Sequence, residues 1–320
     1  MFLQLAARYL SGSGASAKLL ILMYHRVLAQ SDPFLPDDIN AEEFSVQMRL
    51  LEERYHTFTL SEAVRRLSDH SLPPRSVVVT FDDGYRDNCD VALPILQQHG
   101  IPATFFVASG FLGGGRMWND TVIEAIRRVD RGELDLSRLE QGCHTVSGDG
   151  DRISLMQQLI RALKYLPMDT RESRVNELLA AVGKSLPDDL MMEPEQVRVL
   201  SDAGMEIGGH TRSHPILGRV DLAQAEKEIV SGRDDLQEIT GNRITVFAYP
   251  NGRPGQDYQR EHVELLRQNG FDCAVSTAWG CVTGNADRLQ LPRIAPWDRT
   301  RLKFNLRLLR AYTQQDAETV

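Results

Sequence analysis

The stretch Val77-Val78-Val79-Thr80-Phe81-Asp82-Asp83-Gly84 decides the fold class of this chain. The β-branched run from Ser76 to Thr80 predicts a buried parallel strand. Two adjacent carboxylates and a glycine follow at its C-terminal end, which is where α/β folds carry their chemistry. Two neighbouring acids repel each other unless a cation or a shared proton relieves them. The stretch therefore predicts a polar site at the end of a strand, and a divalent metal is the first candidate to occupy it.

Two histidines supply partners for such a metal. They lie in Gly208-Gly209-His210-Thr211-Arg212-Ser213-His214-Pro215, after a short apolar segment that predicts another strand. The four-residue spacing predicts both imidazoles on one side of a helical turn, and the glycines are typical of a tight turn. One carboxylate and two imidazoles leave positions open for water and substrate, as in catalytic zinc sites. Either motif alone is usually a plain turn or loop, but the two together favour a metal site.

The composition is that of an ordinary globular protein. The chain has 320 residues, 42% of them hydrophobic and 25% charged, enough for one large α/β domain or two small ones. The net charge of −8 argues against sequence-independent binding of nucleic acid. The four cysteines form no Cys-x-x-Cys pair. Cys273 and Cys281 are able to pair in an exported protein, but free buried thiols are the favoured interpretation.

The two ends of the chain bear on its location. Residues 1–10 are apolar, but Arg8 interrupts them and the segment is too short for a good signal peptide. No run approaches the length of a transmembrane helix. These features favour the cytoplasm without excluding export. Residues 1–10 and Arg301–Arg310 are both amphipathic and basic, so either is able to contact a membrane surface, although a packing helix is the commoner role.

The predicted elements alternate between strands and helices in the first third of the chain. Strands are expected at Leu19–Met23, Ser76–Thr80 and Ala103–Ala108, and helices at Ala41–Tyr55, from an N-cap at Ser61 through Leu67, and at Asn88–His99. This order implies a parallel sheet or barrel. Strands return at Met205–Ile207, Ile244–Tyr249 and Phe271–Ser276.

Only helices are expected between residue 113 and about residue 200, at Thr121–Val129, Ser154–Leu166 and Thr170–Val182. We interpret residues 113–200 as a helical insertion within a single domain that spans residues 1–320. Residues 300–320 are expected to form a C-terminal helix and tail.

Three motifs in sequence order carry a resemblance to a known family: Thr80–Gly84 (TFDDG), His210–Pro215 (HTRSHP) and Phe247–Gly252 (FAYPNG). They resemble polysaccharide deacetylases of the NodB type, carbohydrate esterase family 4. The resemblance covers roughly residues 19–30, 76–112, 195–255 and 285–297. It implies an irregular (β/α) barrel of about seven strands. The implied activity is metal-dependent hydrolysis of acetyl groups from an N-acetylated carbohydrate, either a polysaccharide or a lipid- or nucleotide-linked glycan.

The resemblance also implies a role for each motif residue. Asp82 would be the general base, and Asp83 would bind the metal together with His210 and His214. The metal would most commonly be zinc, although a His₂Asp set also accepts cobalt, nickel or iron. Backbone N–H groups around Tyr249 to Asn251 would stabilise the oxyanion.

The chain departs from the usual family pattern in two places. No histidine follows His262, so the usual C-terminal Leu-x-His motif is missing. Met23–Val27 (MYHRV) instead resembles a branch with an N-terminal Tyr-His-x-Val motif, which makes His25 the expected general acid. A structural histidine is the alternative. The third motif has Ala248 in place of its arginine, and Arg293 is the candidate to hold Asp82 bidentately. A surface arginine is the alternative.

Further assignments stay open from the sequence. Trp279 is a candidate for lining an acyl-methyl pocket, with core packing as the alternative. Trp118 and Trp297 are candidates for stacking on sugars. The insertion is a lid, a glycan-docking surface or a decoration, and recruitment of His144 from it to the site is the least favoured idea. Two rival functions remain: an amide hydrolase or deformylase acting on a non-sugar substrate, and a glycan-binding module with a degenerate site.

Overall fold

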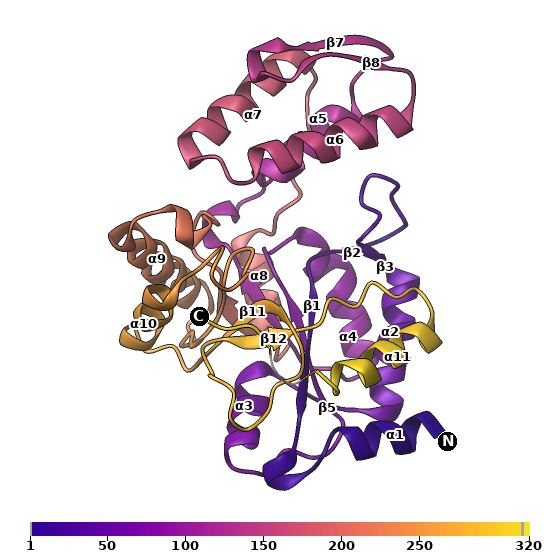
Figure 1. The fold of residues 1–320 in the computed structure, drawn as a ribbon, viewed down its shortest axis with the longest axis vertical. Helices are drawn as coiled ribbons and strands as arrows, with labels where there is room; N and C mark the ends of the chain where they lie inside the picture. The colour runs from indigo at the N-terminus through magenta and orange to yellow at the C-terminus, as the bar shows by residue number, and fades with distance from the viewer. Residues whose placement is uncertain (1, 315–316) are drawn as a thin grey trace. The chain divides into compact units, whose positions relative to one another are not determined.

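A parallel sheet curls into a nearly closed barrel at the centre of the main body (Figure 1). The structure is a computed structural model that describes residues 2–314 and 317–320. The strand order is β1 (Leu19–Tyr24), β5 (Ser76–Phe81), β6 (Ala103–Val107), β9 (Glu206–Gly209), β10 (Val246–Ala248), β11 (Cys273–Trp279) and β12 (Leu291–Arg293). This arrangement confirms the predicted (β/α) barrel of about seven strands with flanking helices.

The barrel closes through the residue that follows β12. Ile294 donates its N–H to the carbonyl of Ile21 at 2.8 Å, and Met23 donates to the carbonyl of Ile294 at 2.9 Å. The last segment of the sheet therefore lies beside β1, the first strand. An eighth short strand, β4 (His56–Phe58), pairs with the N-terminal half of β5. The closure matters for the site because it brings the end of β12 close to the end of β5.

The strands are buried on both faces, as the β-branched sequence predicts for parallel strands. All six residues of β5 are buried, and its register pairs Val77 with Leu20 and Val79 with Leu22 of β1. The helices that flank the barrel are α2 (Ala41–Arg54), α3 (Leu60–Ser68), α4 (Leu93–Gln98), α8 (Pro194–Asp202), α9 (Leu222–Thr240), α10 (Arg260–Gln268) and α11 (Arg301–Ala311). The apolar residues of α2 at helical spacing, Phe44, Met48 and Leu51, are buried as expected.

Two helix starts differ from the prediction. The expected N-cap at Ser61 is wrong, because α3 begins at Leu60. The carboxylate of Glu206 on β9 accepts the N–H of Leu60 at 2.9 Å and that of Ser61 at 3.3 Å. An acid distant in the sequence thus takes the place of a local cap. The helix expected at Asn88–His99 is present, but its first five residues, Asn88–Ala92, form a wider π-helical turn before α4.

Several smaller features complete the main body. Helix α1 (Phe2–Leu10) contacts α11, and β2 (Val27–Leu28) pairs with β3 (Ile39–Asn40). None of the helices in the described part of the chain is long and apolar enough to cross a membrane. The four cysteines are free thiols, and Cys273 and Cys281 are buried as favoured from the sequence.

Residues Gly114–Met191 form a second compact unit. It contains α5 (Trp118–Arg127), α6 (Asp149–Leu163), α7 (Met168–Val182) and an antiparallel hairpin of β7 (Gly132–Leu136) and β8 (Gly142–Val146). The hairpin was not predicted because its strands are largely exposed and lack a β-branched run. The unit ends before α8, whereas the expected insertion ran to about residue 200.

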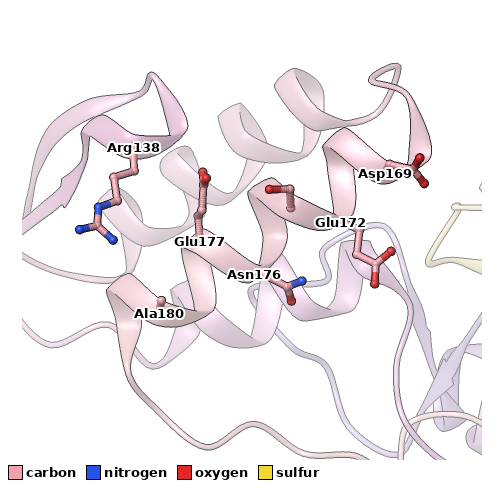
Figure 2. A pocket seen from close by; sticks show the side chains of 7 residues that line it. Arg138, Asp169, Glu172, Asn176, Glu177 and Ala180 are labelled. Atoms are coloured by element: carbon pink, nitrogen blue, oxygen red, sulfur yellow. The ribbon is translucent and has the colours of Figure 1, made fainter.

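A shallow polar hollow lies along α7 in this second unit (Figure 2). Its lining residues are Arg138, Asp169, Glu172, Ser173, Asn176, Glu177 and Ala180. Glu177 already pairs with Arg174 at 3.2 Å. The role of the insertion as a lid, a docking surface or a decoration stays a prediction.

Candidate active site

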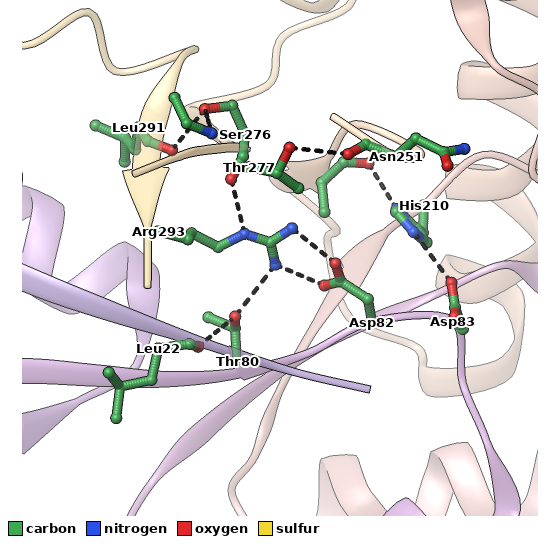
Figure 3. A network of polar contacts seen from close by, with 12 residues as sticks. Leu22, Thr80, Asp82, Asp83, His210, Asn251, Ser276, Thr277, Leu291 and Arg293 are labelled. Atoms are coloured by element: carbon green, nitrogen blue, oxygen red, sulfur yellow. Dashed lines mark hydrogen bonds and ion pairs between the residues drawn. The ribbon is translucent and has the colours of Figure 1, made fainter. Parts of the chain in front are cut away.

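The two aspartates follow β5 directly, and the backbone turns sharply at the second. Asp82 still donates its N–H to the carbonyl of Tyr24 at 2.9 Å, so it continues the strand ladder. Asp83 has a φ of 77°, which is uncommon for a residue with a side chain. This turn breaks the alternation of the strand and lets both carboxylates reach one edge of the barrel (Figure 3). At Gly84, where φ is 93°, a Cβ would lie 2.9 Å from a methyl carbon of Val107.

Asp82 is locked in a buried, bidentate ion pair with Arg293. The two terminal guanidinium nitrogens of Arg293 donate to the two carboxylate oxygens of Asp82, each at 2.7 Å (Figure 3). The side chains of Arg293 and Asp82 are 0% and 4% exposed. Burial opposes ionisation of Asp82, but the charge and hydrogen bonds of Arg293 outweigh it and hold the pKa of Asp82 below its usual value. The pairing expected for Arg293 is present, and the alternative of a surface arginine is wrong.

Arg293 is itself held from two further sides. Its Nε donates to the carbonyl of Ser276 at 2.9 Å, and one terminal nitrogen donates to the hydroxyl of Thr80 at 3.3 Å. The Thr80 hydroxyl in turn donates to the carbonyl of Leu22 at 2.7 Å. The guanidinium therefore reaches Asp82 from β12 in one fixed orientation. Arg293 thus takes the place of the arginine that the usual third motif has where this chain has Ala248 on β10.

Asp83, His210 and His214 form a compact cluster of metal-ligand type. One carboxylate oxygen of Asp83 lies 3.4 Å from Nε2 of His210 and 3.3 Å from Nε2 of His214. The three ligand atoms all lie within 4.8 Å of one another. Nδ1 of His210 lies 2.7 Å from the carbonyl of Ala248, a contact in which only the nitrogen can donate. That hydrogen bond leaves the Nε2 lone pair for a metal. The donor set fits a divalent metal with open coordination positions.

The electrostatics of this cluster also favour a cation. Burial opposes ionisation of Asp83, but its interactions with His210, His214 and His25 outweigh burial and lower the pKa of Asp83. Burial opposes protonation of His210, but Asp83 and Asp82 raise the pKa of His210 above its usual value. Burial lowers the pKa of His214 to about 4, so its imidazole is neutral and able to act as a ligand. Two ionised carboxylates beside an imidazole with a raised pKa mark a position where positive charge is stabilised.

The loop that carries the two histidines is not the helical turn predicted from their spacing. His210 follows β9, and Thr211 and His214 both have left-handed backbones, with φ of 63° and 54°. These two turns bring the imidazole centroids to 4.8 Å. The expected tight turn at Gly208 is also wrong, because Gly208 lies within β9. A Cβ there would lie 2.5 Å from the ring of Phe106, so the glycine makes room for packing.

Helix α9 holds this loop in place. The buried carboxylate of Glu228 accepts the N–H of Arg212 at 3.1 Å, the N–H of Ser213 at 2.7 Å and the hydroxyl of Ser213 at 2.8 Å. A Cβ on Gly232, one turn further along α9, would lie 2.6 Å from the backbone of Thr211. The close approach of helix and loop therefore depends on Gly232, and Glu228 satisfies N–H groups that the left-handed turns leave unpaired.

Backbone strain is concentrated in this region. Among the described residues, seven that are not glycine have a positive φ, and four of them are Asp83, Thr211, His214 and Asn251. Such conformations persist only where the surroundings enforce them, and they cluster at functional sites.

His25 lies at the exposed end of β1. Its side chain is exposed, and its carbonyl accepts a hydrogen bond from the side-chain amide of Asn88 at 2.8 Å. The charge of His25 contributes to lowering the pKa of both Asp82 and Asp83, so its imidazole lies within electrostatic reach of both. This position suits a proton donor, and the role of general acid stays a prediction.

The third motif corrects one assignment and sharpens another. Tyr249 donates its N–H to the carbonyl of Val275 at 3.2 Å and its hydroxyl to the carbonyl of Leu289 at 2.9 Å, so the expectation that Tyr249 supplies an oxyanion donor is wrong. Pro250 has no N–H. Asn251 has a φ of 59°, and its N–H has no partner among the residues that the structure describes. The hydroxyl of Thr277 donates to the carbonyl of Asn251 at 2.9 Å and holds this turn (Figure 3).

The remaining aromatic candidates have packing contacts of their own. Trp279 packs on the main core cluster, with the guanidinium of Arg310 at 5.4 Å from its ring centroid, so core packing accounts for its position. Trp297 is 56% exposed beneath Arg307, and the ring of Trp118 is covered by Arg171. His144 lies on β8, with Nε2 at 2.9 Å from the carbonyl of Gln141. The sugar-stacking and acyl-pocket roles stay predictions.

Four supporting groups were missed from the sequence: Thr80, Ser276, Glu228 and the carbonyl of Ala248. Thr80 had a signal, since it lies two residues before Asp82 and hence on the same face of the strand. Glu228 had none, because a polar residue on a helix is usually a solvated surface residue.

A scan of family models matches the chain to the model described as "Polysaccharide deacetylase", over residues 69–147 and 168–274. The matched residues include Asp82, Asp83, His210, His214 and Asn251. His25 and Arg293 lie outside them, so the assignment of His25 rests on the resemblance of its Tyr-His-x-Val motif and that of Arg293 on its ion pair with Asp82.

Two relatives with similar sequences are named as polysaccharide deacetylases or as N-deacetylases of a glucosamine polymer. YxkH of Bacillus subtilis, provisionally described as a polysaccharide deacetylase, is 22% identical over 280 residues, which are 87% of this chain and 71% of YxkH. The poly-β-1,6-N-acetyl-D-glucosamine N-deacetylase of Staphylococcus epidermidis is 28% identical over 138 residues. That match covers 39% of this chain and 48% of the staphylococcal protein, so it spans about half the length of that relative.

Solved structures share the fold. The Streptococcus pyogenes deacetylase PplD, solved in complex with acetate, aligns with a TM-score of 0.58 and 21% identity over 88% of this chain and 92% of PplD. IcaB from Ammonifex degensii aligns with a TM-score of 0.58 and 20% identity over 94% of this chain and 98% of IcaB. At identities of 20–21%, these alignments show that the barrel fold is shared and do not show a shared activity.

Proposed function

Because this chain belongs to the polysaccharide deacetylase family, we propose that it is a metal-dependent hydrolase that removes N-acetyl groups from a glycan of β-1,6-linked N-acetylglucosamine type. One observation carries the proposal: a buried, ionised Asp82 paired with Arg293 lies beside the ligand cluster of Asp83, His210 and His214. The substrate class is supported by the name of the staphylococcal relative. The expected cytoplasmic location stays a prediction.

The chemistry follows from the residues of the chain. A divalent metal held by Asp83, His210 and His214 would polarise the amide carbonyl and acidify a water molecule. Asp82 accepts the proton of the attacking water, and Arg293 keeps Asp82 ionised and ready to accept it. The unpaired N–H of Asn251 donates to the oxyanion that forms as the carbonyl becomes tetrahedral.

Bond cleavage needs a second proton transfer. An amide nitrogen is a poor leaving group until it is protonated, and His25 is the residue that we propose as donor of that proton. The carbon–nitrogen bond then breaks to give acetate and a free amine on the sugar. The missing arginine of the third motif had favoured a degenerate binding module, but Arg293 supplies the same charge to Asp82 from β12.

The test measures acetate release from β-1,6-linked N-acetylglucosamine oligomers, with β-1,4-linked oligomers as the comparison. We expect faster release from the β-1,6-linked substrate. The Asp82→Asn variant should bind metal as the parent does but release no acetate. Oligomer binding without acetate release by the parent chain would favour the binding module instead. Release from simple N-acetylated amines as fast as from oligomers would favour an amide hydrolase with a non-sugar substrate.

A further inference from the structure

The exposed large apolar side chains of the main body are not scattered. Seven are exposed in the described part of the chain, and five of them lie on two segments: Leu5, Tyr9, Trp297, Leu302 and Leu306. The first two belong to α1 and the last two to α11, and these helices contact each other. Single exposed apolar residues are ordinary, but a cluster of them marks a surface that binds another molecule or a membrane.

Both helices carry apolar residues on their outward as well as their inward faces. On α1, Leu5, Arg8 and Tyr9 are exposed while Ala7 is buried. On α11, Leu302, Lys303 and Leu306 are exposed. The opposite face of α11 contains Phe304 and Leu308, which are fully buried. The inward face of α11 thus packs against the main body, whereas its exposed outward face is covered by no other element among the described residues. We refer to Leu5, Arg8, Tyr9, Leu302, Lys303 and Leu306 as the α1–α11 surface.

The charge of this surface is opposite to that of the chain as a whole. Neither α1 nor α11 contains an aspartate or glutamate, although the chain carries a net charge of −8. Arg301 and Arg307 of α11 already pair with Glu53 and Asp298. Arg8, Lys303 and Arg310 have no acidic partner in the part of the chain that the structure describes. The outward stripes therefore combine leucines and a tyrosine with unneutralised positive charge.

We propose that the α1–α11 surface binds a bilayer that contains anionic lipids. Helices that lie at a membrane interface have this composition, with leucine and aromatic residues buried among the acyl chains and lysine or arginine at the headgroups. A second copy of this chain is a poor occupant, because a two-fold contact would bring together two surfaces that both carry the unneutralised charges of Arg8 and Lys303.

The fifth exposed apolar residue, Trp297, lies outside the α1–α11 surface and precedes α11 in the chain. Trp297 follows Pro296, whose carbonyl accepts a hydrogen bond from Gln47 at 3.1 Å. Gln47 also accepts the hydroxyl of Tyr24, the residue before His25. Leu3 and Ala7 of α1 line a small hollow with Arg75, which precedes β5, so α1 lies at the opposite end of that strand from Asp82.

The test is co-sedimentation of the full chain with vesicles. Vesicles of phosphatidylcholine with phosphatidylglycerol are compared with vesicles of phosphatidylcholine alone, at low and high salt. We expect binding to the anionic vesicles that weakens with salt. A Leu302→Ser/Leu306→Ser double variant should bind at least about tenfold more weakly. An Arg8→Gln/Lys303→Gln variant should lose about fivefold per charge, as expected for basic residues near an anionic surface.

The chain offers a matched control for the apolar variants. Val199 on α8 and Leu222 on α9 are the other two exposed large apolar side chains, and they are 43% and 47% exposed. A Val199→Ser/Leu222→Ser variant should bind vesicles like the parent chain. Equal thermal stability of all variants would show that folding is intact.

Two results would overturn the inference. One is equal sedimentation with anionic and neutral vesicles, or none with either. The other is vesicle binding that survives Leu302→Ser/Leu306→Ser unchanged. Concentration-dependent self-association without vesicles, abolished by that variant, would identify the surface as a contact between copies of this chain instead. None of these results depends on deacetylase activity.

Discussion

Replacing Arg293 by methionine would leave the Asp82 carboxylate buried without its charge partner. In the parent chain the two side chains are 0% and 4% exposed and share two hydrogen bonds of 2.7 Å, so solvent screens this pair very little. Breaking a buried pair by removing one partner typically costs about 3–5 kcal/mol. An exposed pair would cost only about 0–1 kcal/mol. The size of the loss therefore reports directly on whether the pair is buried as described.

The loss should also depend on pH in a definite direction. In the parent chain the pKa of Asp82 is lowered, so the stability that the pair contributes is present above the unfolded pKa of about 4 and is lost as pH falls through the folded pKa. In the variant, burial is opposed only by the smaller effects of His210 and His25, so the pKa of Asp82 rises relative to the parent chain. In acid, Asp82 of the variant is protonated, so the variant avoids most of the cost of burying an unpaired carboxylate. The difference in unfolding free energy between the parent chain and the variant should therefore grow towards neutral pH.

The assay follows urea unfolding by tryptophan fluorescence across this pH range. A Trp118→Phe background confines the signal to the main body, because Trp279 and Trp297 are the other two tryptophans of the chain. An Asp82→Asn/Arg293→Met double variant removes both charges and should recover most of the lost stability. In activity assays, the acidic limb of the pH profile of Arg293→Met should move to higher pH. A loss below about 1 kcal/mol at every pH, with an unmoved acidic limb, would refute the reasoning.

Substitutions at three further residues test their individual roles. His25→Ala should slow acetate release by about 10²–10⁴-fold and leave the metal content unchanged, as expected for the loss of a general acid; unchanged turnover would remove that role. His214→Ala should lose bound metal in elemental analysis, and full occupancy would exclude it as a ligand. Glu228→Ala should weaken metal binding by about 10–100-fold, because Arg212 and Ser213 lose the acceptor that holds the ligand loop. Glu228→Gln retains one acceptor oxygen and should be affected less, and equal affinity in all three chains would show that the loop holds without Glu228.

The barrel and the ligand residues could be predicted because their signals are local. A β-branched run ending in Asp82 and Asp83 marks a buried strand and its functional end. The order of strands and helices then implies a parallel sheet. Helix α2 was placed within one residue because the spacing of Phe44, Met48 and Leu51 matches the face that the helix buries.

The errors came where distant residues override local patterns. Helix α3 starts at Leu60 because Glu206, on a strand far along the chain, accepts its first N–H groups. The His210–His214 spacing suggested a helix, but Glu228 and the close approach of Gly232 enforce a left-handed loop. Tyr249 was a plausible donor until the pairing with Val275 occupied its N–H. No local pattern in the sequence carries these long-range contacts.

The central claim is that Asp83, His210 and His214 hold a metal on which amide hydrolysis depends. The most direct test measures metal content and acetate release on the same purified protein. Elemental analysis is followed by incubation with N-acetylglucosamine oligomers, with and without a chelator. We predict about one divalent metal per chain, as expected for one such ligand set, and acetate release that the chelator abolishes and added metal restores. Acetate release that persists after complete removal of metal, or a chain that binds no metal even on reconstitution, would contradict the account.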